Sequence, residues 1–254
     1  MSVIGVVSMK GGVGKTSTTA NLATALATKL GPGRVSVIDL DPQNALHWHF
    51  GLDEAQTEGV CGQSQHGEDW GGVALATEFD VVCLPYGTVS EPDREAFETL
   101  LADEPDWVGT QIKRAGLGND AVVLIDTPPG PSVYLKQVFA CADLVLIILL
   151  ADAGSYATIP AMESWLDEMS TLYPHLVSVY VLNQVDRSEP LNRDVAEMLH
   201  RHLGARVAPI GIHCDEAVGE ALAFRQPVLV YNPHGQASHD LARLAAWLID
   251  TLNR

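Results

Sequence analysis

Between its first strand-like segment and its first helix-like segment, the chain carries a glycine-rich loop that ends in Lys-Thr. The strand-like segment, Val3–Ser8, is short and rich in β-branched residues, which favour extended structure. The helix-like segment, Thr16–Leu30, repeats apolar residues at helical spacing until Gly31-Pro32-Gly33 ends it. A strand, a tight loop and a covering helix in this order form the repeating unit of α/β folds, and this region predicts one.

The same alternation of short apolar runs and longer amphipathic runs continues along the chain. Further strands are expected at Val35–Leu40, Val81–Leu84, Val122–Ile125, Leu144–Leu150, Val177–Leu182 and Val207–Ile210. Helices are expected over most of Glu91–Ala115, with a break at Pro105, and over Ala157–Tyr173, Leu191–Leu203, Asp215–Phe224 and Ser238–Leu252. This order predicts a doubly wound, mostly parallel sheet, whose ligands bind at the carboxyl ends of the strands.

Length and composition favour one domain that spans residues 1–254. A chain of 254 residues, 47% of them hydrophobic, can bury one sizeable core. The stretch Asp53–Glu78 is rich in glycine, glutamine and acidic residues and shows no clear period. We interpret it as an excursion beside the ligand site, not as a second domain.

The glycine-rich loop has the residues of a phosphate-binding site. Glycines let successive backbone N–H groups turn toward one anion, and the following helix adds its positive end. Lys15 can reach the β and γ phosphates of a nucleotide, and the Thr16 hydroxyl can ligate Mg²⁺. The residues expected to contact the nucleotide here are Gly11, Gly12, Val13, Gly14, Lys15, Thr16 and Ser17. A ligand-free glycine turn is the alternative, and the coincidence of strand, loop, Lys-Thr and helix disfavours it.

Acidic residues end two of the predicted strands. Asp39 and Asp41 stand two positions apart, so their side chains point the same way from a strand end. Asp126 follows four apolar residues and precedes the stiff turn Thr127–Gly130. Plain strand-end turns are the alternative, because Asp-Pro pairs are common in turns. The phosphate loop at the same edge of the sheet favours a role beside the nucleotide.

The loop departs from the general phosphate-loop pattern, since Met9 stands in place of the first glycine and Lys10 follows it. The form Lys-Gly-Gly-Val-Gly-Lys-Thr resembles the P-loop of the MinD/ParA family of ATPases. The resemblance implies that ATP and Mg²⁺ are the cofactors. It also implies a homodimer that forms with ATP, in which Lys10 reaches across the interface to the nucleotide of the other copy.

The same resemblance assigns roles to the acidic residues. Asp41 positions the attacking water, and it is catalytic together with Lys10 and Lys15. Thr16, Asp39 and Asp126 hold Mg²⁺, with Asp39 also supporting the loop and Asp126 acting through water. The expected reaction is slow, dimer-dependent hydrolysis of ATP to ADP and phosphate, which resets a conformational switch.

Two later segments carry the expected base pocket. Asn183 ends a predicted strand, and its amide can donate to adenine and accept from it at once; a turn-forming Asn is the alternative. The segment Pro209–Val218 resembles the part of the family that flanks adenine, with His213 in place of the usual proline. Contacts with the base are therefore expected from Asn183, Ile212, His213 and Asp215.

The segment Ile212–Ala217, followed by Gln226-Pro227-Val228, most resembles the MinD-like ATPases of bacterial cellulose-synthase operons (BcsQ/YhjQ type). The resemblance implies that the protein assists cellulose synthesis or secretion at the inner membrane through protein partners of the secretion complex. Only Arg243 and Arg254 are basic in the last predicted helix and the residues after it, so contact with the membrane is expected to be indirect.

Charge and cysteine usage narrow the alternatives. The chain has 15 Lys and Arg against 32 Asp and Glu, a net charge of −17. Such a surface repels nucleic acid, so no nucleic-acid partner is expected. The cysteines are scattered and form no CxxC pair, which is typical of buried thiols in the cytoplasm. We expect a cytoplasmic protein that partners recruit to the inner membrane face.

Other functions remain open on this fold. A ParA-type ATPase that partitions DNA or cargo is the main alternative, and it needs a basic surface. A metal-cluster carrier of the iron-protein type needs paired interfacial cysteines. A scaffold that holds nucleotide without hydrolysis is disfavoured by Asp41 and Asp126. A small-molecule ligase or kinase would release ADP only with an acceptor.

Overall fold

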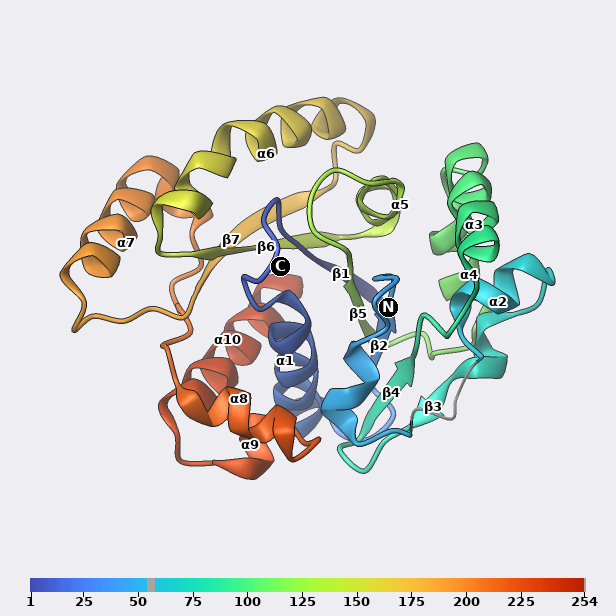
Figure 1. Ribbon diagram of the computed structural model, residues 1–254, viewed down its shortest axis with the longest axis horizontal. Helices are drawn as coiled ribbons and strands as arrows, with labels where there is room; N and C mark the ends of the chain where they lie inside the picture. The colour runs from blue at the N-terminus through green and yellow to red at the C-terminus, as the bar shows by residue number, and fades with distance from the viewer. Residues whose placement is uncertain (54–57, 254) are drawn as a thin grey trace.

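The computed structural model describes residues 1–53 and 58–253, and its centre is a seven-stranded sheet (Figure 1). The strands are β1 (Ser2–Val7), β2 (Val35–Asp39), β3 (Leu75–Ala76), β4 (Val81–Leu84), β5 (Val122–Asp126), β6 (Leu144–Leu150) and β7 (Val177–Asn183). Their order across the sheet is β3-β4-β2-β5-β1-β6-β7. All neighbours pair in parallel except β3, which runs antiparallel to β4 at one edge. The predicted doubly wound, mostly parallel α/β fold is therefore confirmed.

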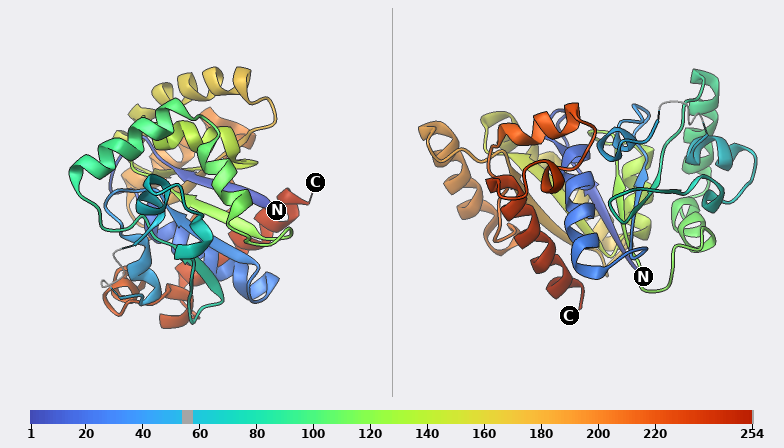
Figure 2. Two further views of the ribbon diagram at one scale, coloured as in Figure 1. Left: turned by 90° about the vertical axis from the view of Figure 1, so that its right-hand side faces the viewer. Right: turned by 90° about the horizontal axis from the view of Figure 1, so that it is seen from below.

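Helices cover both faces of this sheet (Figures 1 and 2). They are α1 (Lys15–Leu30), α2 (Val60–Gln65), α3 (Glu91–Asp103), α4 (Trp107–Arg114), α5 (Val133–Cys141), α6 (Ala153–Leu172), α7 (Pro190–Leu203), α8 (Glu216–Ala223), α9 (Val228–Tyr231) and α10 (Gln236–Leu252). Short 3-10 turns occupy Leu46–Phe50, Trp70–Val73 and Gly204–Arg206. No helix in the described ranges is long and apolar enough to cross a membrane.

The sheet separates two hydrophobic cores, because its central strands are buried on both faces. One core packs Phe97, Tyr134 and Phe139 from α3 and α5 against one face. The other packs Leu26 of α1 and Leu244 of α10 against the opposite face, and these two helices lie side by side (Figure 2). Because both faces of the central strands are buried in these two cores, the strands appear as continuous apolar runs in the sequence.

The predicted strand Val207–Ile210 is wrong. This segment makes one isolated bridge to β7, Tyr180 to Val207, and donates one backbone hydrogen bond to that strand, from the Ala208 N–H to the Tyr180 carbonyl. Pro209 has no N–H to continue a ladder, so pairing stops after one residue. The segment instead follows the open side of β7 as an irregular edge, here called the edge segment (residues 207–214).

Three other regions can be compared with the expectations from the sequence. Helix α5 was not predicted, because its residues are apolar on most sides and show no clear helical period; the Ser132 hydroxyl accepts from the Leu135 N–H and caps it. The break at Pro105 is confirmed by the gap between α3 and α4. In the stretch Asp53–Glu78, residues 54–57 lie outside the described residues, and the remainder forms α2, a 3-10 turn and β3.

Candidate functional site

The phosphate loop joins β1, near the middle of the sheet, to α1. Gly12 and Gly14 have φ values of 73° and 84°, in the left-handed region that glycine adopts without strain. A Cβ on Gly14 would lie 2.5 Å from Asn183 Nδ2, so this position has no room for a side chain. No side chain caps the first turn of α1. Its N–H groups therefore remain available to an anion in the loop.

Lys15 is buried at the base of this loop, with 7% of its surface exposed. Burial lowers the pKa of its ammonium group, while the nearby carboxylates of Asp126 and Asp41 act in the opposite direction. A buried ammonium group is stabilised further by any additional negative charge. The position and charge of Lys15 thus suit it to contact phosphate oxygens.

Asp126 and Thr16 form the one predicted metal-ligand pair that makes a direct contact. The Thr16 hydroxyl donates to Asp126 Oδ2 at 2.6 Å, and the Thr19 hydroxyl donates to Oδ1 at 3.3 Å. Burial raises the pKa of Asp126 to about 6, although the hydrogen bond from Thr16 and the charge of Lys15 oppose this. A hydroxyl and a carboxylate at this distance fit the oxygen ligands that Mg²⁺ prefers.

No three His, Cys, Asp or Glu side chains of the described residues are grouped to hold a metal ion by themselves. A magnesium ion at Thr16 and Asp126 would therefore also need oxygens from nucleotide and water, which is how Mg²⁺ is usually held in nucleotide sites.

Asp39 lies beside Asp126 in the register of β2 and β5, and it is fully buried. Its two oxygens accept backbone N–H groups from Asp41, at 2.9 Å, and Leu46, at 3.0 Å. Burial, with the charge of Asp126 adding to it, raises the pKa of Asp39 well above its usual value. Asp39 thus holds both ends of the loop Asp41–Leu46, here called the first switch loop. Its metal role stays a prediction.

Asp41 stands at the start of the first switch loop and near the charged groups of the site. Its Oδ1 accepts the Gln43 N–H at 2.9 Å. Its charge acts on both Lys15 and Asp126. The structure therefore brings Lys15, Thr16, Asp39, Asp41 and Asp126 together at the carboxyl edge of the sheet.

Lys10 pairs with a residue that the sequence analysis missed. Its Nζ lies 2.7 Å from Asp152 Oδ2. Asp152 follows β6 and caps α6, since its Oδ1 accepts the Ser155 N–H at 2.6 Å. Burial raises the pKa of Asp152, but the hydrogen bonds from Lys10 and Ser155 outweigh it and hold that pKa below its usual value. An acidic residue directly after an apolar strand was the available signal, as at Asp39 and Asp126.

A cavity of about 340 Å³ borders the phosphate loop at Gly14, and the predicted base-pocket residues line it. Its lining includes Gly14, Ser17, Asn183, Ile212, His213 and Asp215. Asn183 Nδ2 donates to the Val13 carbonyl at 2.8 Å, which ties β7 to the phosphate loop. This base cavity is therefore continuous with the loop that would hold the phosphates.

Two acidic side chains shape the base cavity in ways that the sequence did not reveal. Asp215 caps α8 through the Ala217 N–H, at 3.0 Å, and also accepts the Ala237 N–H, at 3.1 Å. Asp240, buried on α10, accepts from His213 through Oδ2: the backbone N–H lies at 3.0 Å and ring Nδ1 at 2.7 Å. Asp215 is thus occupied with backbone groups, and the His213 ring is held in place.

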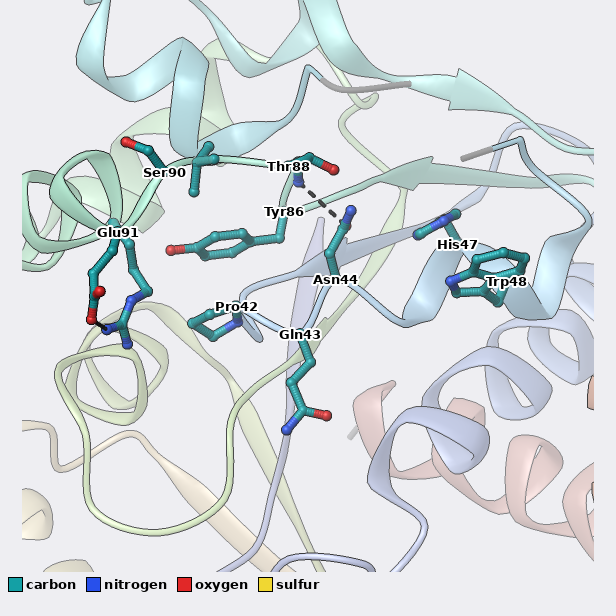
Figure 3. A pocket seen from close by; sticks show the side chains of 12 residues that line it. Pro42, Gln43, Asn44, His47, Trp48, Tyr86, Thr88, Ser90 and Glu91 are labelled. Atoms are coloured by element: carbon teal, nitrogen blue, oxygen red, sulfur yellow. Dashed lines mark hydrogen bonds and ion pairs between the residues drawn. The ribbon is translucent and has the colours of Figure 1, made fainter. Parts of the chain in front are cut away.

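A larger cavity, of about 660 Å³, lies between the first switch loop and the segment that joins β4 to α3 (Figure 3). Asn44, at φ 49°, accepts the Gly87 N–H at 3.2 Å across it. The buried Tyr86 hydroxyl lies 2.9 Å from the hydroxyl of Tyr134 on α5. Together the two contacts connect the first switch loop, through the segment that joins β4 to α3, to the helix α5 that follows Asp126 in the sequence.

The comparisons with known proteins agree with this geometry. The sequence profile of the family described as cellulose biosynthesis protein BcsQ matches residues 1–249. The chain belongs to the BcsQ family. The cellulose biosynthesis protein BcsQ of Salmonella typhimurium is 28% identical over 253 residues, covering 98% of this chain and 94% of that protein. The predicted resemblance to the BcsQ branch is confirmed.

Two solved structures that hold a nucleotide and magnesium share this fold. Cobyrinic acid a,c-diamide synthase from Mycobacterium smegmatis, with bound ADP and magnesium, has a TM-score of 0.80 at 20% identity and covers 99% of this chain and 95% of its own. MinD from Pyrococcus horikoshii, in complex with Mg-ADP, has a TM-score of 0.75 at 22% identity and covers 97% of this chain and 95% of its own. These likenesses establish the fold.

Proposed function

We propose that this BcsQ-family protein is an ATPase that binds ATP and Mg²⁺, dimerises with ATP and assists cellulose synthesis or secretion through protein partners. The observation that carries the proposal is the cluster of Lys15 and Thr16, which follow a glycine loop with left-handed backbone, with Asp126 at the end of β5. The similarity to the cellulose biosynthesis protein BcsQ of Salmonella typhimurium supports the role in cellulose synthesis. The nucleotide-bound neighbours with the same fold support ATP and Mg²⁺.

The residues at the sheet edge have distinct tasks in this proposal. Loop N–H groups and Lys15 bind the β and γ phosphates and orient the terminal one. Thr16 and Asp126 would hold Mg²⁺, which offsets charge on the phosphate oxygens when bound. Asp41 orients a water for attack on the γ phosphorus; the phosphorus–oxygen bond to ADP breaks, and phosphate leaves with the water oxygen. This reaction needs positioning and no protein nucleophile.

The contacts around the loop support a switch between nucleotide states. The Gly130 N–H donates to the Ser8 carbonyl at 2.8 Å, and the Thr127 hydroxyl donates to the Val6 carbonyl at 3.0 Å. These bonds connect the turn after Asp126 to β1 and the phosphate loop. Loss of the γ phosphate would alter the contacts of Asp41 and of this turn together, because both lie at the same edge.

Lys10 would complete the site in the dimer. In the single chain it is held by Asp152, with 36% and 40% of the two side chains exposed. An ion pair exposed to this degree contributes only about 0–1 kcal/mol. Lys10 can therefore leave Asp152 at small cost for the phosphates of a second copy, where several negative charges are concentrated.

The acidic surface supports protein partners over DNA. A net charge of −17 gives an unfavourable field near a phosphate backbone. Recruitment to the inner membrane face from the cytoplasm would then occur through partners of a cellulose synthase or secretion complex. DNA partitioning of the ParA type stays the alternative, and salt-dependent binding to duplex DNA would favour it.

Phosphate release with Mg²⁺-ATP tests the enzymatic part. Lys15→Ala should reduce the rate to background, while Lys29→Ala should leave it unchanged, because Lys29 lies in the last turn of the same helix. A wild-type rate no higher than that of Lys15→Ala, across a range of protein concentrations, would favour a nucleotide-holding scaffold. A rate that appears only with an added acceptor would favour a ligase or kinase.

A further inference from the structure

A third cavity, of about 350 Å³, lies at the β7 edge of the sheet, beside the base cavity. Its walls are the end of β7 and the residues after it, α7, and the edge segment (α7 lies next to β7 in Figure 1). Its ionisable lining residues are Arg187, Arg193, Glu197, His200 and His213. The proposed ATPase mechanism gives no role to this cavity, and of these five residues only His213 also borders the base cavity.

The charge of this cavity is opposite to that of the chain. The cavity lining contains two arginines and one glutamate, whereas acidic residues outnumber Lys and Arg by 32 to 15 in the whole chain. Arg187 forms no ion pair with any of the described residues. Arg193 approaches Asp194 at 3.7 Å, and both side chains are more than half exposed, so that pair is weak. Both guanidinium groups are thus available to an anion.

The neighbouring imidazole is held in a fixed orientation. Asp240 binds both the backbone N–H and the ring Nδ1 of His213. This leaves Nε2 as the ring atom that can bind a ligand, since Nδ1 is already engaged. His213 lines the base cavity as well as this one. A ligand in this third cavity would therefore contact a residue that also borders the base cavity.

The rest of the lining is apolar. Leu182, Val185, Ala196 and Pro209 form much of it, and Gly211 lies against the Leu182 carbonyl. A cavity of this size holds more than one inorganic ion and is within the usual range for small metabolites. Cationic groups beside an apolar wall suit a ligand with an anionic head and a short carbon body.

We propose that this cavity binds a small phosphomonoester. Arg187 and Arg193 bind the phosphate oxygens, because guanidinium groups match phosphate in charge and in planar, two-donor geometry. His213 Nε2 and His200 contribute further polar contacts, and the carbon body lies against Val185 and Pro209. The proposal stands apart from ATP hydrolysis, since none of its residues belongs to the phosphate loop.

Calorimetric titration with glycerol 3-phosphate tests the proposal. The protein is first saturated with Mg²⁺ and a slowly hydrolysed ATP analogue, so that the phosphate loop is already filled. Arg187→Gln and Arg193→Gln should each weaken binding about tenfold, the loss of one charge-assisted contact. Glu197→Gln should tighten binding, because it removes the one negative charge of the lining. Arg201→Gln is the matched control, an exposed arginine on the same helix that does not line the cavity.

NMR spectra of the histidine side chains under the same conditions give a second readout. On addition of the ester, the ring signals of His213 should shift, and those of His66 should remain unchanged. Inorganic phosphate and vesicles that contain phosphatidic acid separate the sources of the phosphate group. Equal affinity for inorganic phosphate and the ester, or binding to vesicles alone, would overturn the metabolite assignment. Equal binding by wild type and both cavity-arginine variants, or equal losses in Arg201→Gln, would overturn the site itself.

Discussion

Replacing Gly14 by alanine tests whether the phosphate loop and the base pocket are packed as one unit. Gly14 has φ 84°, where an alanine costs about 1–2 kcal/mol. Its Cβ would also lie 2.5 Å from Asn183 Nδ2. Moving that amide breaks the 2.8 Å bond to the Val13 carbonyl, which costs about 1 kcal/mol more. The free energy of unfolding should therefore fall by about 2–3 kcal/mol.

Gly12→Ala is the matched control for this experiment. Gly12 has φ 73°, but a Cβ there has no neighbour within 4 Å, so only the backbone cost of about 1–2 kcal/mol applies. Urea unfolding of both variants, without nucleotide, measures the difference. Asn183→Ala should remove the extra loss in Gly14→Ala, because it removes the clashing amide. Equal losses for Gly12→Ala and Gly14→Ala, unaffected by Asn183→Ala, would refute the reasoning.

The remaining predictions concern a charge pair and a buried histidine. Asp152→Asn keeps an oxygen that caps α6 but loses the charge that holds Lys10. The free energy of unfolding should therefore fall by about 1 kcal/mol or less. The fraction of dimer that light scattering detects with an ATP analogue should increase. No change in that fraction would argue against a pairing of Lys10 that competes with dimerisation. Burial lowers the pKa of His49 to about 4. Unfolded His49 takes up a proton as pH falls below about 6.5, whereas the folded residue stays neutral until about 4, so stability is retained above 6.5 and lost on acidification. Between pH 6.5 and 4.5 the wild type should lose about 2 kcal/mol more than His49→Gln in pH-dependent urea unfolding; parallel losses would contradict the buried neutral state.

Much of the fold could be predicted because its signals are local. The parallel strands are buried on both faces, so each appears as a short apolar run, and β6 matches its predicted bounds. The phosphate loop is also local, since one stretch supplies the glycines, Lys15 and Thr16. Asp39 and Asp126 were found because a parallel sheet brings carboxyl ends to one edge; their adjacency in register is a consequence of that topology.

What the sequence did not reveal depends on contacts between distant segments. The pairing of Lys10 with Asp152 joins residues 142 positions apart, and the hold of Asp240 on His213 needs the position of α10 relative to β7. Asp39 was predicted as a metal ligand, and its two backbone contacts became visible only once the path of the first switch loop was known. The basic cavity at β7 likewise gathers Arg187, Arg193 and His213 from separate segments.

The most direct test of the ATP-gated dimer is light scattering after size exclusion, on wild type and Lys10→Ala, with ADP and with a slowly hydrolysed ATP analogue plus Mg²⁺. We expect monomers with ADP, a dimer of wild type with the analogue, and loss of that dimer in Lys10→Ala. A monomer in every state would contradict the dimer switch for the isolated chain. A dimer in every state, unchanged in Lys10→Ala, would show that ATP does not control assembly and that Lys10 has another role.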